Sequence, residues 1–432
     1  MFRCLYAYMF RCLNDNKGYS AIVSIILVAG IGAVIAGSFG SVTIAKQKIL
    51  RNVLNSAQSY YLAEAGIEDA ILRIIDPAIP YQLTETLTLA STTVSTTITQ
   101  TGNNITILSE GDKDNYIRNV QVTLSANTES ASFNYGVQVG QGGLEMKNDG
   151  TIEGNVYSDV DIIGTNDPII TGDAWASGTH IIKGFTIGVD AHANTLQNND
   201  IGQDAYYQSI SGTTVGGTSY PGSPDPESQA LPLTAEQIEV WKEDAAAGGA
   251  SGSYTLEGDD TASLGPVKIE GNLIIKNSAI LTLSGTVWVT GDITLEDNGV
   301  LRLDSGYGEN SGLLIADGSI FIKNNFIVCG SEGYDADEAA CYPENGSYVL
   351  LLSTKTGEDA ISLENNADIN GIIYTSAGEV SVKNNARVMA VTGYEIEVEN
   401  NVIITYESGL VNLNFSSGPG GGWKIGAWRE VE

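Results

Sequence analysis

The pattern of apolar and polar residues changes its period several times along the chain. Residues 19–45 contain no charged side chain. As a helix they would be about 40 Å long, enough to cross the roughly 30 Å hydrocarbon layer of a membrane. Beyond them, apolar residues recur at helical spacing: Leu50, Val53, Leu54, Ala57 and Tyr61, followed by Ile67, Ala70 and Ile71. The pattern predicts one helix over 19–76, transmembrane in its first half and amphipathic in its second.

The period then becomes two. Three stretches between residues 92 and 126 alternate apolar and polar residues, and the turn sequences "TGNN" and "GDKDN" separate them. They predict a short antiparallel sheet within 77–134. A small sheet needs a partner to bury its apolar face, so we expect it to pack on the second half of the helix.

A third pattern repeats seven times. Each copy reads apolar, any residue, apolar, Lys or Glu, Asn or Asp, polar, and then returns to apolar; the copies start at Leu144, Leu273, Ile293, Ile320, Ile361, Val380 and Ile396. After Leu273 the starts differ by 20, 27, 41, 19 and 16 residues, a period of 16–20 if the two longer gaps are insertions. Such a period predicts a parallel β-helix, with regular coils over 267–410 and irregular first coils over 135–203.

The paired Asn residues of this pattern mark one corner of the predicted coils. Asn at a tight corner can adopt the left-handed conformation, and stacked amides can bond to one another between coils. We expect Asn277, Asn324, Asn365, Asn384 and Asn400 in one column. The adjacent column would hold Asn298, Asn325, Asn366, Asn385 and Asn401. This role is structural and needs no ligand.

Two segments interrupt or end the pattern. Residues 204–266 are rich in Gly, Ser, Thr and Pro and predict an insertion, with one helix over 234–247 that has Thr234 and Gln237 as a capping box. Trp241 would hold that helix against the solenoid. Residues 411–432 predict a cap over the end or flank of the solenoid, because an uncapped coil exposes edge strands. The alternative is that Trp423 and Trp428 form a carbohydrate platform.

These patterns together predict an α+β chain: a long N-terminal transmembrane and amphipathic helix with a small antiparallel sheet, followed by a mainly-β parallel β-helix solenoid. Charge adds to this picture. Of a net charge of −31, residues 1–73 carry seven basic and four acidic groups, and the remainder carries 14 basic and 48 acidic groups. So acidic a body repels nucleic acid and anionic lipid, and we expect neither as its partner.

No cofactor is expected. Asp112 and Asp114 in "GDKDN" could touch Ca²⁺, but the other oxygen ligands of a calcium loop are missing, which favours a plain turn. The chain contains two His residues and none of the common hydrolase or phosphate-loop motifs. Some parallel β-helices are polysaccharide lyases or hydrolases, and a site assembled across coils would leave no motif. We expect a protein that is not an enzyme.

Small residues recur every four positions in the transmembrane segment, at Ala33, Gly37 and Ser41. Such a face lets another helix approach closely, although membrane helices also tolerate Gly without any partner. Arg3, Arg11 and Lys17 precede the segment and favour a cytoplasmic N-terminus. Basic residues also follow it, so charge alone does not fix the orientation.

The sequences "NKGYSAIVSIILVAG" and "NSAQSYYLAEAGIEDAI" resemble the N-terminus of type IV pilin-like proteins, above all the PilX-type minor pilins and the pseudopilins of type II secretion. The resemblance covers about residues 14–75. It implies a leader over 1–18, a cut between Gly18 and Tyr19 by a prepilin peptidase, and assembly with other pilin or pseudopilin subunits. Most pilins have Glu five residues after the cleaved Gly, and here that residue is Val23. Its loss is a feature of pseudopilins thought to sit at a filament tip.

The cysteines fit an exported protein. Cys4 and Cys12 lie in the leader, and Cys329 and Cys341 remain, with eleven residues between them. A location outside the cytoplasm permits a disulfide, which we expect here. The sequence therefore predicts a minor pilin or pseudopilin anchored through 19–45, with its head outside the cytoplasm in a cell-surface pilus. The alternative is an anchored adhesin or glycan-binding β-helix that does not enter a filament. The ligand of the head stays unknown.

Overall fold

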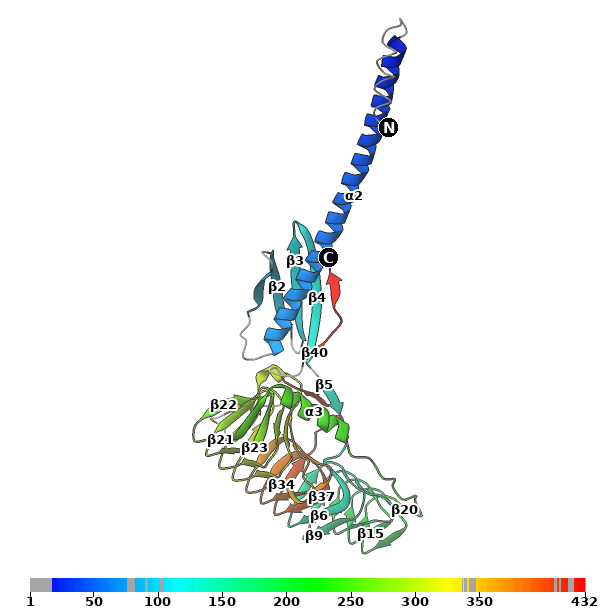
Figure 1. Ribbon diagram of the computed structural model, residues 1–432. Coiled ribbons are helices and arrows are strands. Elements are labelled where there is room, and N and C mark those ends of the chain that lie inside the picture. Colours follow the sequence, from blue (N-terminus) through cyan, green and yellow to red (C-terminus); the bar gives the residue numbers. More distant parts are fainter. Residues whose placement is uncertain are drawn as a thin grey trace.

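The computed structural model describes residues 18–75, 82–89, 92–101, 104–126, 128–335, 337, 340–341, 347–407, 410–411, 413–418 and 423–431. The described part of the chain starts with a helix, α2 (Gly18–Ile75), of 58 residues, which gives a length of about 87 Å. Its C-terminal part lies along a small sheet, and the large β-structure of the head follows below (Figure 1). The predicted leader lies outside the described residues, apart from Gly18 at the start of α2.

The small sheet is antiparallel and lies beside α2. It contains the three predicted strands, β2 (Thr92–Thr101), β3 (Asn104–Lys113) and β4 (Tyr116–Ala126), and β1 (Thr84–Leu89) at one edge. The other edge comes from the C-terminus, because β40 (Trp423–Ile425) and β41 (Arg429–Val431) both pair with β4. The prediction that residues 411–432 cap the solenoid is therefore wrong for these strands, and Trp428 packs on the core between α2 and the small sheet.

Two glycines let α2 lie close to the sheet. A methyl group at Gly111 of β3 would lie 2.1 Å from the carbonyl oxygen of Ser59, and one at Gly66 would lie 2.3 Å from the Ser109 hydroxyl. The buried face of the helix includes Ser59 and Ala63 as well as Ile67 and Ala70 further on. It does not include the Leu50 to Tyr61 stripe. The two apolar runs that the sequence joins thus lie on different faces, since six residues from Tyr61 to Ile67 turn a helix by about 240°.

The head is one parallel β-helix. Its first block of coils runs from residue 137 to 221 and consists of β6 (Val137–Lys147), β7 (Thr151–Glu153), β8 (Val156–Ser158), β9 (Ile162–Thr165), β10 (Ile169–Ile170), β11 (Ala174–Ala176), β12 (Ile181–Lys183), β13 (Thr186–Ile187), β14 (Ala191–His192), β15 (Thr195–Gln197), β16 (Asp200–Ile201), β17 (Ala205–Tyr207), β18 (Ser209–Ser211), β19 (Thr214–Val215) and β20 (Ser219–Pro221).

The second block runs from residue 250 to 405. It consists of β21 (Ala250–Glu257), β22 (Thr261–Leu264), β23 (Val267–Lys276), β24 (Ile280–Leu283), β25 (Val287–Val289), β26 (Ile293–Leu295), β27 (Val300–Leu303), β28 (Gly312–Ala316), β29 (Ile320–Ile322), β30 (Ile327–Cys329), β33 (Val349–Ser353), β34 (Gly357–Leu363), β35 (Asp368–Thr375), β36 (Gly378–Lys383), β37 (Arg387–Glu399) and β38 (Ile403–Thr405). A 3₁₀ turn, η1 (Ser305–Tyr307), lies between β27 and β28, and a side hairpin of β31 (Tyr334–Asp335) and β32 (Ala340–Cys341) lies between β30 and β33.

The predicted insertion is shorter than its sequence suggests. Residues 205–221 and 250–264 are coils, so only residues 222–249 leave the solenoid. We call this segment the strap. It contains α3 (Ala235–Ala247), whose Thr234 cap and Gln237 form the predicted capping box with hydrogen bonds of 3.2 and 3.0 Å. The strap runs along the outside from one end of the solenoid to the other (Figure 1).

The strap changes the order of the coils. The last coil of the second block lies on the first coil of the first block, since β37 pairs with β6 and β38 pairs with β7. The chain thus enters the solenoid in the middle, runs to one end, crosses along the strap to the other end and returns to its starting point. The repeat pattern over 135–203 and 267–410 did not predict this order along the axis. The two blocks meet where residues far apart in sequence become neighbours.

Two apolar clusters hold the head together. One fills the interior, where equivalent residues stack from coil to coil along the axis: Ile293, Ile320, Ile361, Val380, Ile396, Leu144 and Ile162. The other lies outside the solenoid, beneath α3 and a two-stranded neck of β5 (Thr128–Ala131) and β39 (Leu413–Ser416). The Trp241 ring of α3 packs edge-on against the Phe415 ring of the neck, with 5.5 Å between the ring centroids. The strap helix therefore fastens the neck to the head.

Candidate assembly surface

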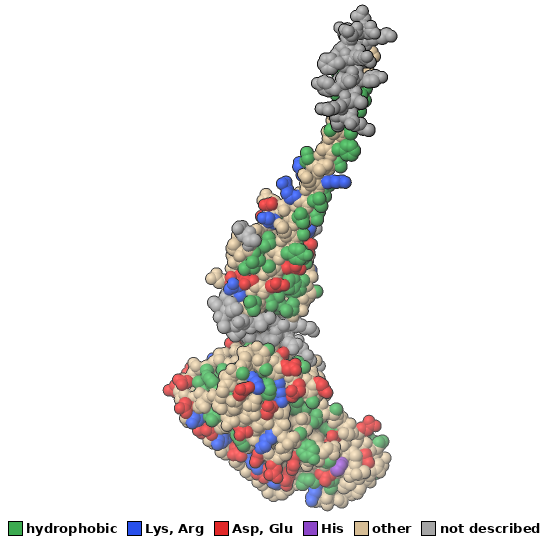
Figure 2. Space-filling model, in the orientation of Figure 1, with side chains coloured by type: hydrophobic (Ala, Val, Ile, Leu, Met, Phe, Trp, Pro, Cys, Tyr) green, Lys and Arg blue, Asp and Glu red, His purple; other side chains and the backbone are tan. Residues whose placement is uncertain are grey.

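Among the described residues, an exposed apolar stripe lies on α2. Leu50, Val53, Leu54 and Tyr61 are each 60–67% exposed, although they lie beyond the uncharged segment 19–45. Apolar side chains line the visible side of the helix and the small sheet, whereas acidic side chains are frequent on the head (Figure 2). A membrane would not cover residues this far along the helix, because Lys46, Lys48 and Arg51 come before or among them.

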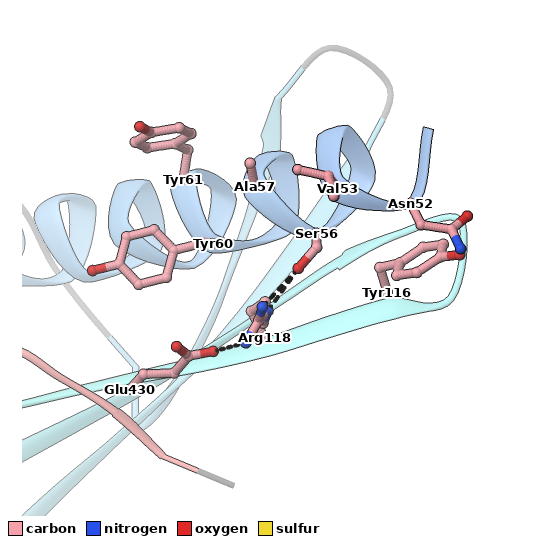
Figure 3. A pocket seen from close by; sticks show the side chains of 9 residues that line it. All are labelled: Asn52, Val53, Ser56, Ala57, Tyr60, Tyr61, Tyr116, Arg118 and Glu430. Carbon is pink, nitrogen blue, oxygen red and sulfur yellow. Dashed lines mark hydrogen bonds and ion pairs between the residues drawn. The ribbon is translucent and has the colours of Figure 1, made fainter. Parts of the chain in front are cut away.

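A groove of about 550 Å³ lies beside this stripe, between α2 and the C-terminal edge of the small sheet (Figure 3). Its walls come from three elements that are distant in sequence: Asn52, Val53, Ser56, Ala57, Tyr60 and Tyr61 from α2, Tyr116 and Arg118 from β4, and Glu430 from β41. The groove is open and continuous with the exposed stripe. It offers aromatic and aliphatic surface to a neighbouring side chain or helix.

Arg118 joins the three walls of the groove. Its guanidinium donates from Nε and Nη2 to the Ser56 hydroxyl at 2.9 and 2.7 Å, and its Nη1 pairs with the Glu430 carboxylate (Figure 3). Because both the arginine and the glutamate are partly exposed, the pair itself contributes little free energy. Its effect is positional, since it holds the C-terminal strand and β4 beside the helix.

Tyr60 lies on the same helix turn, between the groove and the sheet. A hydrogen bond to the neighbouring Glu64 carboxylate, aided by desolvation, raises the pKa of Tyr60. Like an ordinary tyrosine it is neutral at physiological pH, and it acts as a hydrogen-bond donor with an apolar ring. The groove thus holds one charged pair and otherwise neutral side chains.

The predicted packing and processing positions lie on the same helix. Ala33, Gly37 and Ser41 are exposed, and a methyl group placed at Gly37 would meet no atom within 4 Å apart from the backbone of its own helix turns. The Ser41 hydroxyl donates to the Ser38 carbonyl at 2.8 Å. Gly18 and Tyr19 form the first turn of α2. Within the described residues, one helix, Ser20–Ile74, is long and apolar enough to cross a membrane by length and composition. The small-residue face is free to meet another helix.

The Asn corner lies in the head, away from this surface. Side-chain amides bond from coil to coil at 2.7–3.2 Å through Asn166, Asn148, Asn400, Asn384, Asn365, Asn324 and Asp297. Asn277 lies one coil beyond Asp297 and has the same left-handed backbone, with φ of 56°. The residue after each corner Asn is also left-handed. The repeated pairs in the sequence therefore form a ladder that connects both blocks of coils.

The remaining predicted positions are structural as well. Cys329 and Cys341 form a disulfide that ties the side hairpin to β30. Asp114 accepts a hydrogen bond from Asn55 of α2 at 3.2 Å, and one Asp112 oxygen is buried without a partner. Among the described residues no three acidic, His or Cys side chains gather as a metal site would require.

Sequence reasoning missed the groove, because its third wall is the C-terminal strand. In the sequence, this wall was indicated only by two single residues. Glu430 is an acidic partner for Arg118, and Trp428 is a large apolar side chain close to the C-terminus. Three-residue strands such as β40 and β41 are too short to show alternation. Their pairing depends on the distant β4 and not on their own pattern.

Comparisons with known proteins add little. The sequence matches no protein family and no curated protein. Among solved structures it is similar to the competence-associated pilin ComZ from Thermus thermophilus, with 13% sequence identity and a TM-score of 0.25, over 87% of this chain and 98% of that one. So low a TM-score carries no inference about this chain.

Proposed function

We propose that this chain is a minor pilin-like or pseudopilin-like subunit of a type IV filament system. Prepilin peptidase would cut it after Gly18. The helix α2 would anchor it in the cytoplasmic membrane before assembly and pack against other pilin or pseudopilin subunits afterwards. The β-helix would be displayed outside the cytoplasm, and we propose no catalytic activity for it. The N-terminal sequence resemblance supports the family, and the exposed stripe supports assembly.

The observation that carries the proposal is the stripe itself. A protein that is only anchored needs an apolar surface over the membrane and none above it. Here the apolar face continues for three further turns and is flanked by the groove. Burying each large apolar side chain stabilises by about 1.5–3 kcal/mol, so leaving four of them in water is unfavourable. Packing against neighbouring helices in a filament would remove this exposure.

The test places a charge on the stripe. Leu54→Asp should leave membrane insertion and cleavage unchanged, because residue 54 lies beyond both the apolar segment and the cut. Recovery of the protein in sheared filaments, relative to the membrane fraction, should fall at least tenfold. The matched control is Val240→Asp, which puts the same charge at an exposed position of α3 in the head. Equal recovery of Leu54→Asp and wild type would favour the anchored adhesin over the filament subunit.

Processing gives an independent test. Gly18→Asp should block the peptidase and leave a longer precursor in the membrane, visible by mass spectrometry of the intact protein. A mature N-terminus at Tyr19 in this variant would contradict the pilin assignment. Gly37→Leu then separates anchoring from assembly. It preserves apolar length but fills the small-residue face, so insertion should persist while filament recovery falls.

A further inference from the structure

The two ends of the solenoid differ in a way that assembly through α2 does not explain. We call the coil formed by β18, β19 and β20 the distal end, because it lies at the end of the head away from α2 (Figure 1). In the part of the chain that the structure describes, each of these strands pairs with one strand of the preceding coil: β18 with β15, β19 with β16 and β20 with β17. Their other edges present backbone groups that no strand occupies. Open edges of this kind readily pair with another chain.

The distal end is also uncharged. Residues 205–224 contain no Asp, Glu, Lys or Arg, in a chain whose net charge is −31. Natural proteins usually protect an open edge with charges, bulges or proline, and within the described residues 205–221 Pro221 at the end of β20 is the one proline. The apolar core is incompletely covered at this end, where Ile210 and Val215 are only partly buried. The coil therefore lacks the polar outer face that terminal solenoid repeats normally carry.

A stack of aromatic rings runs along one outer face of the solenoid and stops at this end. Trp175, His192, Tyr206 and Tyr220 occupy equivalent positions in successive coils. Their rings are nearly parallel, with centroid separations of 5.4, 4.3 and 4.7 Å. Tyr220 is 41% exposed, and among the described residues it stacks only on Tyr206. One face of the terminal ring is thus free.

We propose that the distal end binds an extended, uncharged peptide segment of another protein, which adds a strand to β20 and places an aromatic side chain on Tyr220. The spacing carries this inference. Neighbouring strands lie about 4.7–4.9 Å apart, which is the separation of the Tyr206 and Tyr220 rings. A strand in register with β20 would therefore bring its own ring to stacking distance without adjustment. Main-chain hydrogen bonds give such an interaction its affinity, and the aromatic contact gives it its specificity.

The same observations disfavour other occupants. A second copy of this chain brings an equally acidic head, and the two heads would repel each other at close range. A sugar could stack on Tyr220, but it would leave the backbone edges of β18, β19 and β20 unpaired. An acidic segment would meet the charge of the surrounding head. A neutral strand with an aromatic residue satisfies the open edge, the free ring and the lack of charge together.

The opposite end of the solenoid shows what a protected edge looks like in the same molecule. Its outermost strand, β21, changes register against β23 between Gly252 and Tyr254, because β23 has one residue more than β21 at this bulge, and a bulge bends and twists the strands locally. Asp259 and Asp260 add two negative charges beside it, and Glu257 forms an ion pair with Lys276 at 3.2 Å. The distal end has neither a bulge nor a charge. This contrast within one chain supplies a matched control for the experiment.

The experiment uses the full-length protein in detergent and a fluorescent uncharged peptide, acetyl-TSTYTVT-amide, with a second peptide that has Ala in place of Tyr. Fluorescence anisotropy measures binding to wild type and to four variants. Tyr220→Phe keeps the ring, Tyr220→Asp and Thr214→Asp place a charge on the distal end, and Thr255→Asp places the same charge on β21. Circular dichroism and the melting temperature establish that each variant folds, and size-exclusion light scattering gives its mass.

The expected result is saturable binding of the Tyr peptide to wild type, Tyr220→Phe and Thr255→Asp. Binding should weaken at least tenfold in Tyr220→Asp and Thr214→Asp and for the Ala peptide. Three results would overturn the proposal. One is no saturable binding at about 1 mM peptide. Another is binding that Thr255→Asp weakens as much as Thr214→Asp does. The last is Tyr220-dependent binding on a glycan array, or a Tyr220-dependent dimer in light scattering, without peptide binding.

Discussion

The base and the head of this protein are stabilised in opposite ways. The base, formed by the second half of α2 and the small sheet, depends on a few close contacts, such as Gly111 against the backbone at Ser59. The head repeats one set of contacts in every coil, so that its Asn ladder, its interior rows and its strand pairing continue from coil to coil. The base leaves an apolar stripe uncovered, and the head buries nearly all of its large apolar residues.

The difference indicates how each part responds to change. In a solenoid, each coil contacts mainly its neighbours. A substitution at one position therefore removes one of many similar contacts and lowers the stability of the whole only slightly. In the base, one helix meets one sheet, and a change at the point of closest approach affects the whole contact. We therefore expect single substitutions to disrupt the base as a unit and to weaken the head by degrees. The following predictions test this contrast.

The largest effect is expected at Gly111 in the base. In Gly111→Val, the new Cβ would lie 2.1 Å from the Ser59 carbonyl oxygen, an approach that backbone atoms cannot relieve locally. The small sheet should separate from α2, with a loss of more than about 4 kcal/mol. Limited proteolysis of the full-length protein should then cut within residues 82–126, while the head fragment stays resistant.

The matched control for that prediction lies in the head. Gly252 is also in a strand, but no atom lies within 4 Å of a methyl group placed there. Gly252→Val should change stability by less than about 0.5 kcal/mol. If Gly111→Val and Gly252→Val gave the same protease pattern, the close contact between α2 and the sheet would not be what holds the base together.

A smaller effect is expected for the disulfide, which ties a hairpin to the head. By the loop-entropy relation, closing a loop of this length contributes about 3 kcal/mol. In Cys329→Ser combined with Cys341→Ser, the hairpin of β31 and β32 should become sensitive to protease. The rest of the coils should unfold in a single transition at a lower temperature. Loss of the entire head, measured by circular dichroism at 25 °C, would show that the solenoid is less tolerant than its repeats indicate.

How far the sequence predicts these two parts depends on the range of the contacts involved. The Asn corners could be predicted from the sequence because the left-handed conformation is a local property. The three central strands of the small sheet could be predicted for the same reason. The helix cap at Thr234 was equally local. In each case the residues that determine the structure lie within one turn or one strand of each other.

Contacts between distant segments could not be read in this way. Every coil has a similar residue pattern on both of its edges. The local sequence therefore does not determine that β37 pairs with β6 and not with a later strand. The return of β40 and β41 to β4 is equally hidden. For the candidate surface, the apolar spacing of the stripe could be predicted from the sequence. Its exposure could not, because it depends on which face of α2 the small sheet covers. Two small residues, Gly66 and Gly111, determine that choice.

The junction between the two blocks gives a prediction about pH. Burial disfavours the charged form of Glu397, but hydrogen bonds from Lys383 and Lys147 outweigh it and lower the pKa of Glu397 to about 2. Lys147 comes from β6 and Glu397 from β37, so the pair joins the first coil to the last. Because the folded pKa lies below the unfolded one, this stabilisation is present above about pH 4.5 and is lost as the pH falls toward 2.

The measurement compares thermal unfolding of wild type and Glu397→Gln between pH 7 and pH 2. Wild type should be more stable by about 2 kcal/mol at pH 7, a value that allows for partial solvent screening. The difference should shrink below about pH 4.5 and vanish near pH 2. A constant difference over the whole range would mean that Glu397 contributes through packing and not through its charge.

The smallest effect is expected in the Asn ladder. Comparing two adjacent Asn residues there separates the side-chain hydrogen bonds from the left-handed backbone of the same corner. The Asn384 side chain donates to Asn365 at 3.2 Å and accepts from Asn400 at 2.9 Å, whereas among the described side chains Asn385 accepts from Asn401 alone, at 3.4 Å. Both have a left-handed backbone, with φ of 57° and 62°, which glycine adopts without strain. Asn384→Gly and Asn385→Gly therefore cost similar conformational entropy but remove different hydrogen bonds. We expect Asn384→Gly to be less stable by about 1 kcal/mol in denaturant unfolding, because partly exposed hydrogen bonds contribute about that much. Equal stability of the two variants would mean that the Asn side-chain hydrogen bonds contribute nothing to the free energy of unfolding beyond the left-handed corner itself. The tolerance of the head to substitution would then come from its strand pairing alone.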